Sequence, residues 1–107
     1  MHFNLGQYEE AIIDDTQLLF YDPENTDILY ERGMLQRFLH RDKEAIIDLN
    51  KVLELEPSIG LAYLERARAH AQAGQWKKAK SDYQAAGKMG IKMAPQDEEL
   101  MKRKGKN

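Results

Sequence analysis

The chain has 107 residues, of which 16 are basic and 18 acidic, so its net charge is −2, and it contains no cysteine. This length suggests one domain, and the lack of cysteine excludes disulfides and thiolate metal sites and fits a reducing compartment, so we expect a cytoplasmic protein. No stretch reaches the roughly 18 apolar residues of a membrane span, and positive charge gathers only in the tail from Lys88 onward, so we expect neither a membrane nor a nucleic acid as partner.

Apolar residues at three-and-four spacing predict five helices in series. These are expected at about 8–21, 26–39, 42–55, 58–73 and 75–86. No strand pattern appears, because Val, Ile and Thr are sparse. Connections of two to four residues make consecutive helices antiparallel neighbours.

The helix ends are marked by specific residues. Pro23 and Pro57 stop the first and third helices, since proline disfavours helix at the residue before it. Asn25 is expected to cap the second helix and Ser58 the fourth, because their side chains accept from free first-turn amides.

The most informative feature is a repeat with a period of 34 residues. The residues that recur in step are Gly6, His40 and Gly74; Ala11, Ala45 and Ala79; Pro23 and Pro57; Gly33 and Ala67; and Asp14, Asp48 and Asp82. A period of this length indicates one helical hairpin stacked on copies of itself, because a single hairpin cannot bury its own apolar face. The small residues at these positions let helix backbones approach closely.

Arginine recurs in step with aspartate and suggests a repeated ion pair. We expect Arg32 to pair with Asp14 or Asp48, and Arg66 with Asp48 or Asp82. A charge-assisted Arg–Asp bond between neighbouring helices would be geometrically specific.

Several segments in phase resemble the tetratricopeptide repeat, over residues 1 to about 87. The segments that carry the resemblance are 29–33 and 63–67, which look like unit openings; 6–11 and 74–79, which look like the turn and second-helix start; and the endings at Pro23 and Pro57. The resemblance implies an all-α, open right-handed solenoid of antiparallel helix pairs, about two and a half repeats long. We place this domain at 1–90 and a C-terminal tail at 91–107.

The chain departs from the family pattern at three places. His40 replaces a turn glycine, so this turn is expected to hold a non-glycine residue in a strained or permissive conformation. The helix at 8–21 lacks its own pair partner, and we expect it to expose Ile12 and Leu19, as a fragment of a longer array or a chain that pairs with a second copy. The segment 87–90 replaces the last proline ending, so the solenoid is expected to stop there. Beyond it, 94–104 is either a short helix whose Leu100 and Met101 cap the last pair or a frayed tail.

In the tetratricopeptide family the first helix of each pair lines a concave groove. Carried over by position, the resemblance assigns the groove to Asp27, Tyr30, Glu31, Met34, Arg37, Phe38, Leu61, Leu64, Glu65, Arg68 and Gln72. It implies a non-catalytic protein-interaction module that binds a peptide or protein segment there. The alternative is an assembly element, a homo-dimer joined through the unpaired first helix.

Some family members hold the C-terminal carboxylate of chaperone peptides with basic and amide side chains. Here the matching positions carry Glu31, Leu61 and Glu65. Carboxylates would repel an anionic peptide end, so we expect a neutral or basic ligand instead.

The residues that could carry chemistry are scattered. His2, His40 and His70 lie 38 and 30 residues apart, with no second ligand at helical spacing that would suit a metal. Helices that pack about 10 Å apart also hold the aspartate ladder too far apart for one cation, which needs oxygens at about 2.3–2.6 Å. The sequence therefore predicts no enzymatic activity, no cofactor and no metal.

Overall fold

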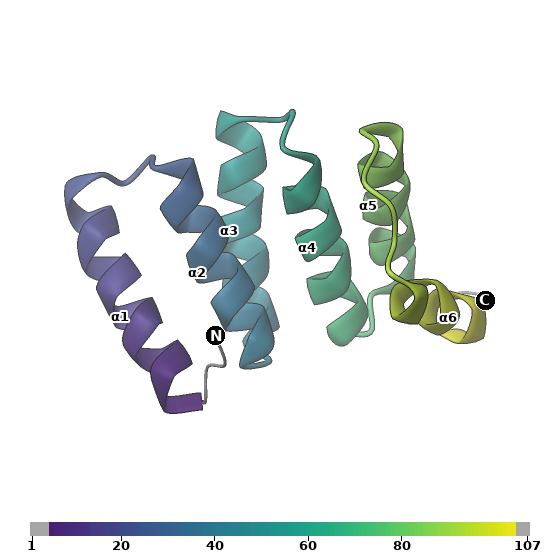
Figure 1. Cartoon of the computed structure of the whole chain (residues 1–107), viewed down its shortest axis with the longest axis horizontal. Helices are drawn as coiled ribbons and strands as arrows, with labels where there is room; N and C mark the ends of the chain where they lie inside the picture. The colour runs from purple at the N-terminus through teal and green to yellow at the C-terminus, as the bar shows by residue number, and fades with distance from the viewer. Residues whose placement is uncertain (1–4, 105–107) are drawn as a thin grey trace.

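The computed structural model describes residues 5–104 and shows an all-α chain without strands in that range. Its helices are α1 (Leu5–Tyr21), α2 (Thr26–Phe38), α3 (Asp42–Leu55), α4 (Gly60–Gln72), α5 (Trp76–Lys88) and α6 (Pro95–Lys104). Figure 1 shows α1 to α5 side by side in chain order along the longest axis, each antiparallel to the next. The described part measures 42 × 29 × 24 Å. The predicted open stack of helix pairs is confirmed.

The capping predictions succeed at one helix and fail at another. Asn25 Oδ1 accepts from the Ile28 amide at 3.1 Å, as expected for a side-chain cap of α2. The prediction for Ser58 is wrong: Ile59 occupies the cap of α4 and makes no side-chain cap bond. A turn after Pro57, with the Ile59 amide donating to the Glu56 carbonyl at 3.3 Å, delays the helix start to Gly60.

His40 turns the chain between α2 and α3 in a left-handed conformation. Its φ is +58°, and Gly74, one repeat later, has φ of +77°. The expectation of a non-glycine residue in a glycine conformation is confirmed, and an L side chain there carries strain.

Replacing His40 with glycine should therefore stabilise the fold. We expect the free energy of unfolding to rise by about 0.5–1 kcal/mol. This is the strain that the substitution relieves, minus the additional backbone entropy that glycine loses on folding. The midpoint of urea unfolding measures it. The matched control is Gly74→Ala, which should lower stability through strain alone because a Cβ there meets nothing within 4 Å. A lower midpoint for His40→Gly would contradict this interpretation.

Small residues bring the helices of each pair together, as the repeat predicted. Ala45, Ala67 and Ala79 are fully buried. A Cβ built on Gly33 would lie 3.1 Å from Leu49 Cγ, so α2 and α3 approach closely there and a side chain at position 33 would require Leu49 to shift.

Ala45→Leu should overpack this contact and cost roughly 1–3 kcal/mol. The thermal melting midpoint gives the measurement, and Lys51→Leu, exposed on the same helix, is the control with little expected change. A midpoint unchanged by Ala45→Leu would argue against the close approach of α2 and α3.

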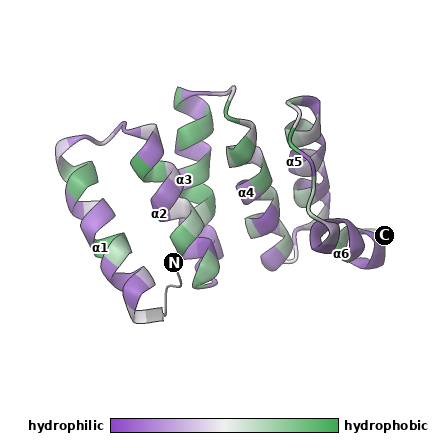
Figure 2. Cartoon of the chain, in the orientation of Figure 1, coloured by the Kyte–Doolittle hydropathy of each residue, from purple (hydrophilic) through white to green (hydrophobic). Residues whose placement is uncertain are grey.

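The buried side chains form two clusters along the stack. One gathers around Leu49 and Val52, and the other around Ala79 and Tyr83; Tyr63 packs against both. Each hairpin is therefore covered by its neighbours in series. Figure 2 shows hydrophobic colour recurring along α1 to α5, whereas α6 is mostly hydrophilic.

The repeated arginines clamp each pair with the same geometry. Arg32 Nε and Nη2 donate to Asp48 at 2.7 and 2.8 Å, and Arg66 makes the same two bonds to Asp82, both at 2.7 Å. Of the two partners considered for each arginine, the one within the same hairpin is correct and the one in the preceding hairpin is wrong. The preceding helix supplies a neutral oxygen instead, from Asn50 to Arg66 at 2.9 Å.

The expectation from the sequence that α1 exposes Ile12 and Leu19 is wrong. Ile12 and Leu19 are 9% and 7% exposed, because α2 covers them and Leu19 joins the same cluster as Leu29. The exposed apolar side chains of α1 are instead Ile13, Leu18, Phe20 and Tyr21.

Candidate functional site

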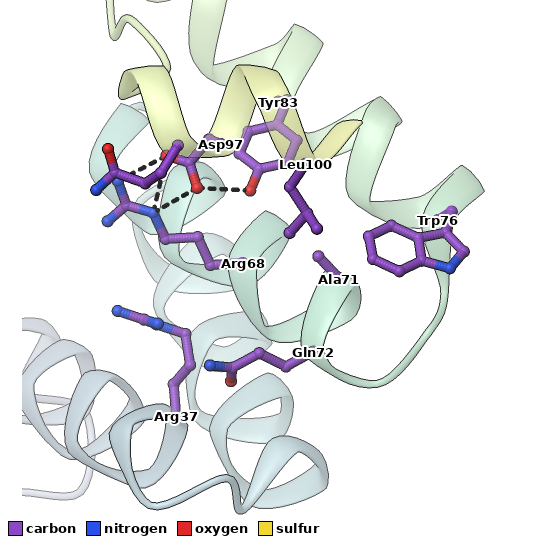
Figure 3. A pocket seen from close by; sticks show the side chains of 9 residues that line it. Arg37, Arg68, Ala71, Gln72, Trp76, Tyr83, Asp97 and Leu100 are labelled. Carbon is purple, nitrogen blue, oxygen red and sulfur yellow. Dashed lines mark hydrogen bonds and ion pairs between the residues drawn. The ribbon is translucent and has the colours of Figure 1, made fainter. Parts of the chain in front are cut away.

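A chain of alternating charges crosses the stack on its α2, α4 and α6 side. Arg37 Nε of α2 donates to Glu65 Oε2 of α4 at 2.6 Å, and Arg68 Nη1 donates to Glu65 Oε1 at 3.1 Å. Arg68 Nη2 then donates to Asp97 Oδ2 of α6 at 2.8 Å. The hydroxyl of Tyr83 in α5 donates to Asp97 Oδ1 at 3.0 Å. Figure 3 shows Asp97 between Arg68 and Tyr83.

Asp97 is the buried anchor of this network, with 6% of its surface exposed. Burial alone would raise its pKa, but the hydrogen bonds and charge of Arg68, with further bonds from Tyr83 and the Ala94 amide, hold the pKa below its usual range. The carboxylate therefore stays ionised at neutral pH. Burial, followed by the charge of Asp97, raises the pKa of Tyr83, so its hydroxyl remains a donor.

A pocket of about 440 Å³ opens beside this network, between the C-terminal ends of α2 and α4 and the side of α6 that carries Asp97 and Leu100. Its lining comprises Arg37, Arg68, Ala71, Gln72, Trp76, Tyr83, Gln96, Asp97 and Leu100. Charged groups form one wall, and Figure 3 shows Leu100, Ala71 and Trp76 on the opposite side. The pocket therefore offers polar and apolar contacts side by side.

The structure distributes the sequence-predicted groove residues among three environments. Asp27, Glu31, Leu61 and Gln72 are exposed, with Phe38 at the exposed limit; Tyr30, Met34, Arg37 and Arg68 are partly buried; Leu64 and Glu65 are buried. Arg37, Arg68 and Gln72 meet at the pocket. We use "the groove" for the surface of α2 and α4 that carries these predicted residues, Leu64 excepted.

Three of the predicted groove residues are engaged by other parts of the chain. Leu64 packs in the cluster around Ala79, so its assignment to the surface is wrong. Glu65 is 5% exposed and neutralised by two arginines, because a buried carboxylate requires such partners. Phe38 turns toward α1, where its ring lies 5.4 Å from that of Tyr8.

The pocket also contains residues that the sequence did not indicate as a site. Asp97 lay within the expected tail helix at 94–104 and Trp76 within the family-like segment 74–79, whereas Tyr83 carried no assignment. No repeated signal shows where α6 docks, since its partners lie 14 and 29 residues away in the chain.

A second carboxylate is buried at the other end of the stack. Asp15 of α1 is 5% exposed, and its Oδ2 has no hydrogen-bond partner within the described residues. Burial, then the neighbouring Glu31, raises the pKa of Asp15 to about 6, against a smaller lowering by Arg32. Asp15 stands one repeat before Leu49, so a carboxylate replaces the core leucine of α3.

This raised pKa makes stability fall as the pH rises. Between its unfolded pKa of about 3.9 and the folded value of about 6, the native state keeps a proton that the unfolded chain has released, so the stabilisation present at pH 4 is lost by pH 7. Asp15→Asn should remove this loss and be more stable than the parent at pH 7 by about 1–2 kcal/mol, allowing for solvent screening. Urea unfolding from pH 4 to 8 measures it; parallel curves for the two proteins would contradict it.

Within residues 5–104, no group of three or more His, Cys, Asp or Glu side chains is placed to hold a metal ion. His70 is buried with Nδ1 2.7 Å from Gln75 Oε1 and Nε2 3.6 Å from Asp82, and His2 lies outside the described residues. None of the described helices combines the length and apolarity needed to cross a bilayer.

Comparison with known proteins identifies the class to which this arrangement belongs. A model of the tetratricopeptide repeat matches residues 26–59, which contain α2 and α3. The chain belongs to the tetratricopeptide-repeat family, as the repeat period and the stacked hairpins also indicate.

Several characterised proteins contain a similar region. The chain is 38% identical over 87 residues to the tetratricopeptide repeat and J domain-containing co-chaperone DNJ1 of Fusarium oxysporum, covering 81% of the chain and 17% of that protein. It is 26% identical over 98 residues to the protein STIP1 homolog of Dictyostelium discoideum, covering 92% of the chain and 17% of that protein. With human sperm-associated antigen 1 it shares 38% identity over 64 residues, 60% of the chain and 7% of that protein. The chain thus spans less than a fifth of each of these relatives.

Proposed function

We propose that the chain is a non-catalytic protein-interaction module that binds a peptide or protein segment along the groove. The observation that supports this most strongly is the pocket of about 440 Å³ at its end, where exposed Gln72 and partly buried Trp76 lie beside Arg37 and an apolar wall. Half-buried Tyr30 and exposed Leu61 extend this surface along α2 and α4. Aromatic and aliphatic side chains of this kind suit an extended or helical segment.

The charges of the groove differ between its two ends. Asp27 and Glu31 are exposed on α2, so the segment bound there is neutral or basic. Glu65 adds little repulsion because Arg37 and Arg68 neutralise it. We therefore retain the expectation that the groove does not hold an anionic chaperone tail through Glu31, Leu61 and Glu65.

The partner is a protein. The Fusarium relative is a co-chaperone by its name, and we propose a comparable docking role for the region that this chain represents. A cytoplasmic location agrees with the absence of cysteine.

Quantitative capture from a native lysate tests this function. Leu61→Ala and Gln72→Ala change exposed groove residues, whereas Ile47→Ala changes a side chain of α3 that is 65% exposed. We expect the two groove variants to lose the same captured proteins and the α3 variant to keep them. Loss that follows Ile47 and spares the groove variants would refute the proposal.

Self-association through α1 is the second candidate function, favoured by one observation. Phe20 and Tyr21 are 81% and 85% exposed and form an edge-to-face pair 5.2 Å apart. Sedimentation equilibrium of the chain and of Phe20→Ser tests it. A dimer abolished by Phe20→Ser would support this function, and a monomer at all concentrations would exclude it.

A further inference from the structure

We propose that the surface beneath α6 is a docking site for a partner helix that presents an acidic side chain and, three residues later, an aliphatic one, and that α6 is a tethered occupant of this site. The inference rests on the proposed function and specifies the partner chemistry at the pocket end of the groove.

The first argument is the way in which α6 is held. Its one buried residue is Asp97, whose carboxylate receives Arg68 and Tyr83 from the stack. Leu100 and Met101 are partly buried against the last cluster, and the remaining side chains are mostly charged and exposed. Recognition therefore depends on an acidic and an aliphatic residue at i and i+3, which lie on one face of a helix.

The second argument is charge complementarity. Arg68 bonds to Glu65 as well as to Asp97. Without α6, the linked side chains of Arg37, Glu65 and Arg68 carry two positive charges and one negative charge. Asp97 completes the balance. An incoming carboxylate at this position would meet a preorganised guanidinium and a phenol donor.

The third argument is that α6 does not stack as the next repeat. It begins at Pro95, close to one period after Gly60. At the positions where α2 and α4 carry an arginine followed by a small residue, α6 carries two large apolar residues, Leu100 and Met101. Without a small residue at that position the backbone cannot approach closely. Figure 1 shows α6 lying across the direction of the other helices, at the end of the stack near the α4–α5 turn.

The fourth argument is that α6 fills its site incompletely. The pocket of about 440 Å³ remains between α6 and the groups of Arg37, Gln72 and Trp76. Figure 3 shows Leu100 pointing toward Ala71, with the Trp76 ring beyond it. A partner helix with a larger apolar residue would reach surface that α6 leaves open.

The linker allows exchange without unfolding the stack. Ile91 packs on Gly60, because a Cβ at Gly60 would lie 2.7 Å from Ile91 Cγ1. This contact anchors the chain before α6, so α6 is presented at an effective concentration on the order of 1 mM. Weak ligands are excluded by α6, and only a partner that binds more tightly displaces it.

The test uses the full chain and a peptide of its own residues 94–104, acetylated, amidated and fluorescently labelled. Asp97→Ala releases α6, and Glu98→Ala, exposed in the same turn, is the matched control. Binding is measured by anisotropy up to about 1 mM. Emission of Trp76, the only tryptophan, and amide exchange of residues 95–104 report release of α6.

We expect the peptide to bind the Asp97→Ala chain at least roughly tenfold more tightly than the parent or the Glu98→Ala chain, because the tethered competitor is gone. A peptide with asparagine in place of its aspartate should lose roughly tenfold in affinity, the loss of a charged hydrogen-bond partner. Equal binding to parent and Asp97→Ala chains would overturn the proposal, as would no binding while far-ultraviolet circular dichroism shows α1 to α5 intact.

An Asp97→Ala chain that is unfolded in the absence of denaturant would also overturn the proposal. A segment that a partner can displace cannot be essential to the fold. Failure of this test with continued loss of captured proteins in Leu61→Ala and Gln72→Ala would remove only the α6 proposal. Capture that is unchanged in Leu61→Ala and Gln72→Ala, with the α6 test successful, would remove the proposed function alone.

Discussion

Leu49→Ala should lower the free energy of unfolding by about 3–4 kcal/mol, as expected for a fully buried leucine whose cavity does not collapse. Leu49 is one of the two largest fully buried side chains, and it packs directly against the backbone of Gly33. The residue joins α2, α3 and the cluster that continues to Ala62, so its loss weakens the middle of the stack. Chemical denaturation with urea gives the measurement.

A second substitution tests the geometry behind this number. A Cβ at Gly33 would point at Leu49 Cγ, 3.1 Å away, which is also where Leu49→Ala leaves its cavity. Gly33→Ala combined with Leu49→Ala should therefore be less destabilised than the sum of the single variants, with a coupling of about 1 kcal/mol. Ile47→Ala, exposed on the same helix, should change stability little. Additive single effects would contradict the close contact.

The second large effect is expected for Arg66→Met. The substitution leaves Asp82, 8% exposed at its side chain, without its bidentate partner. Among the ion pairs within residues 5–104, Asp82 keeps the contact with His70 at 3.6 Å. Breaking a buried ion pair by removing one partner costs about 3 kcal/mol. Because a hairpin at the end of a repeat array contacts few neighbours, we expect amide exchange to rise first in α4 and α5.

The matched control for this prediction is a solvent-exposed pair. Arg41 pairs with Glu9 at side chains that are about half exposed, so Arg41→Met should cost no more than about 0.5 kcal/mol. Replacing both members, as Arg66→Met with Asp82→Leu, should recover stability relative to Arg66→Met, because no buried charge is left alone. An Arg66→Met chain as stable as the parent would show that the clamp contributes little.

The parts of the fold that were predictable are those that recur. The period of 34 residues specified the hairpins of α2 with α3 and of α4 with α5, because Ala45 and Ala79 must sit at equivalent contacts. The same periodicity could not choose between Asp14 and Asp48 as the partner of Arg32. Both lie in one register, and only the packing within a hairpin distinguishes them.

Features that occur once were predicted only in part: the Asn25 cap and a tail helix were expected and are present. Helical spacing placed Ile12 and Leu19 on an apolar face of α1, but it could not show that α2 covers this face while Phe20 remains exposed. Leu100 and Met101 of α6 pack on the last pair as expected, but the sequence did not show that Asp97 meets side chains from two other helices. Such a contact has no periodic signal.

Some of the groove residues assigned from the family lie together, and others do not. Family position brought Arg37, Arg68 and Gln72 to one pocket, as the structure shows. It did not indicate that Glu65 is paired with two arginines of the same chain. The sequence alone does not distinguish a carboxylate that is free in a groove from one that is held between two arginines. The charge available to a partner is therefore less negative than the residue list suggests.

The docking role of the groove is tested most directly by locating a bound peptide on the folded chain. Peptides selected from a random display library against the full chain would be titrated into isotope-labelled protein, and amide and indole shifts would be followed by nuclear magnetic resonance. We expect the largest shifts at Tyr30, Arg37, Arg68 and Trp76. Shifts confined to the outer surface around Ile47 and Lys51, with the groove unchanged, would contradict the account.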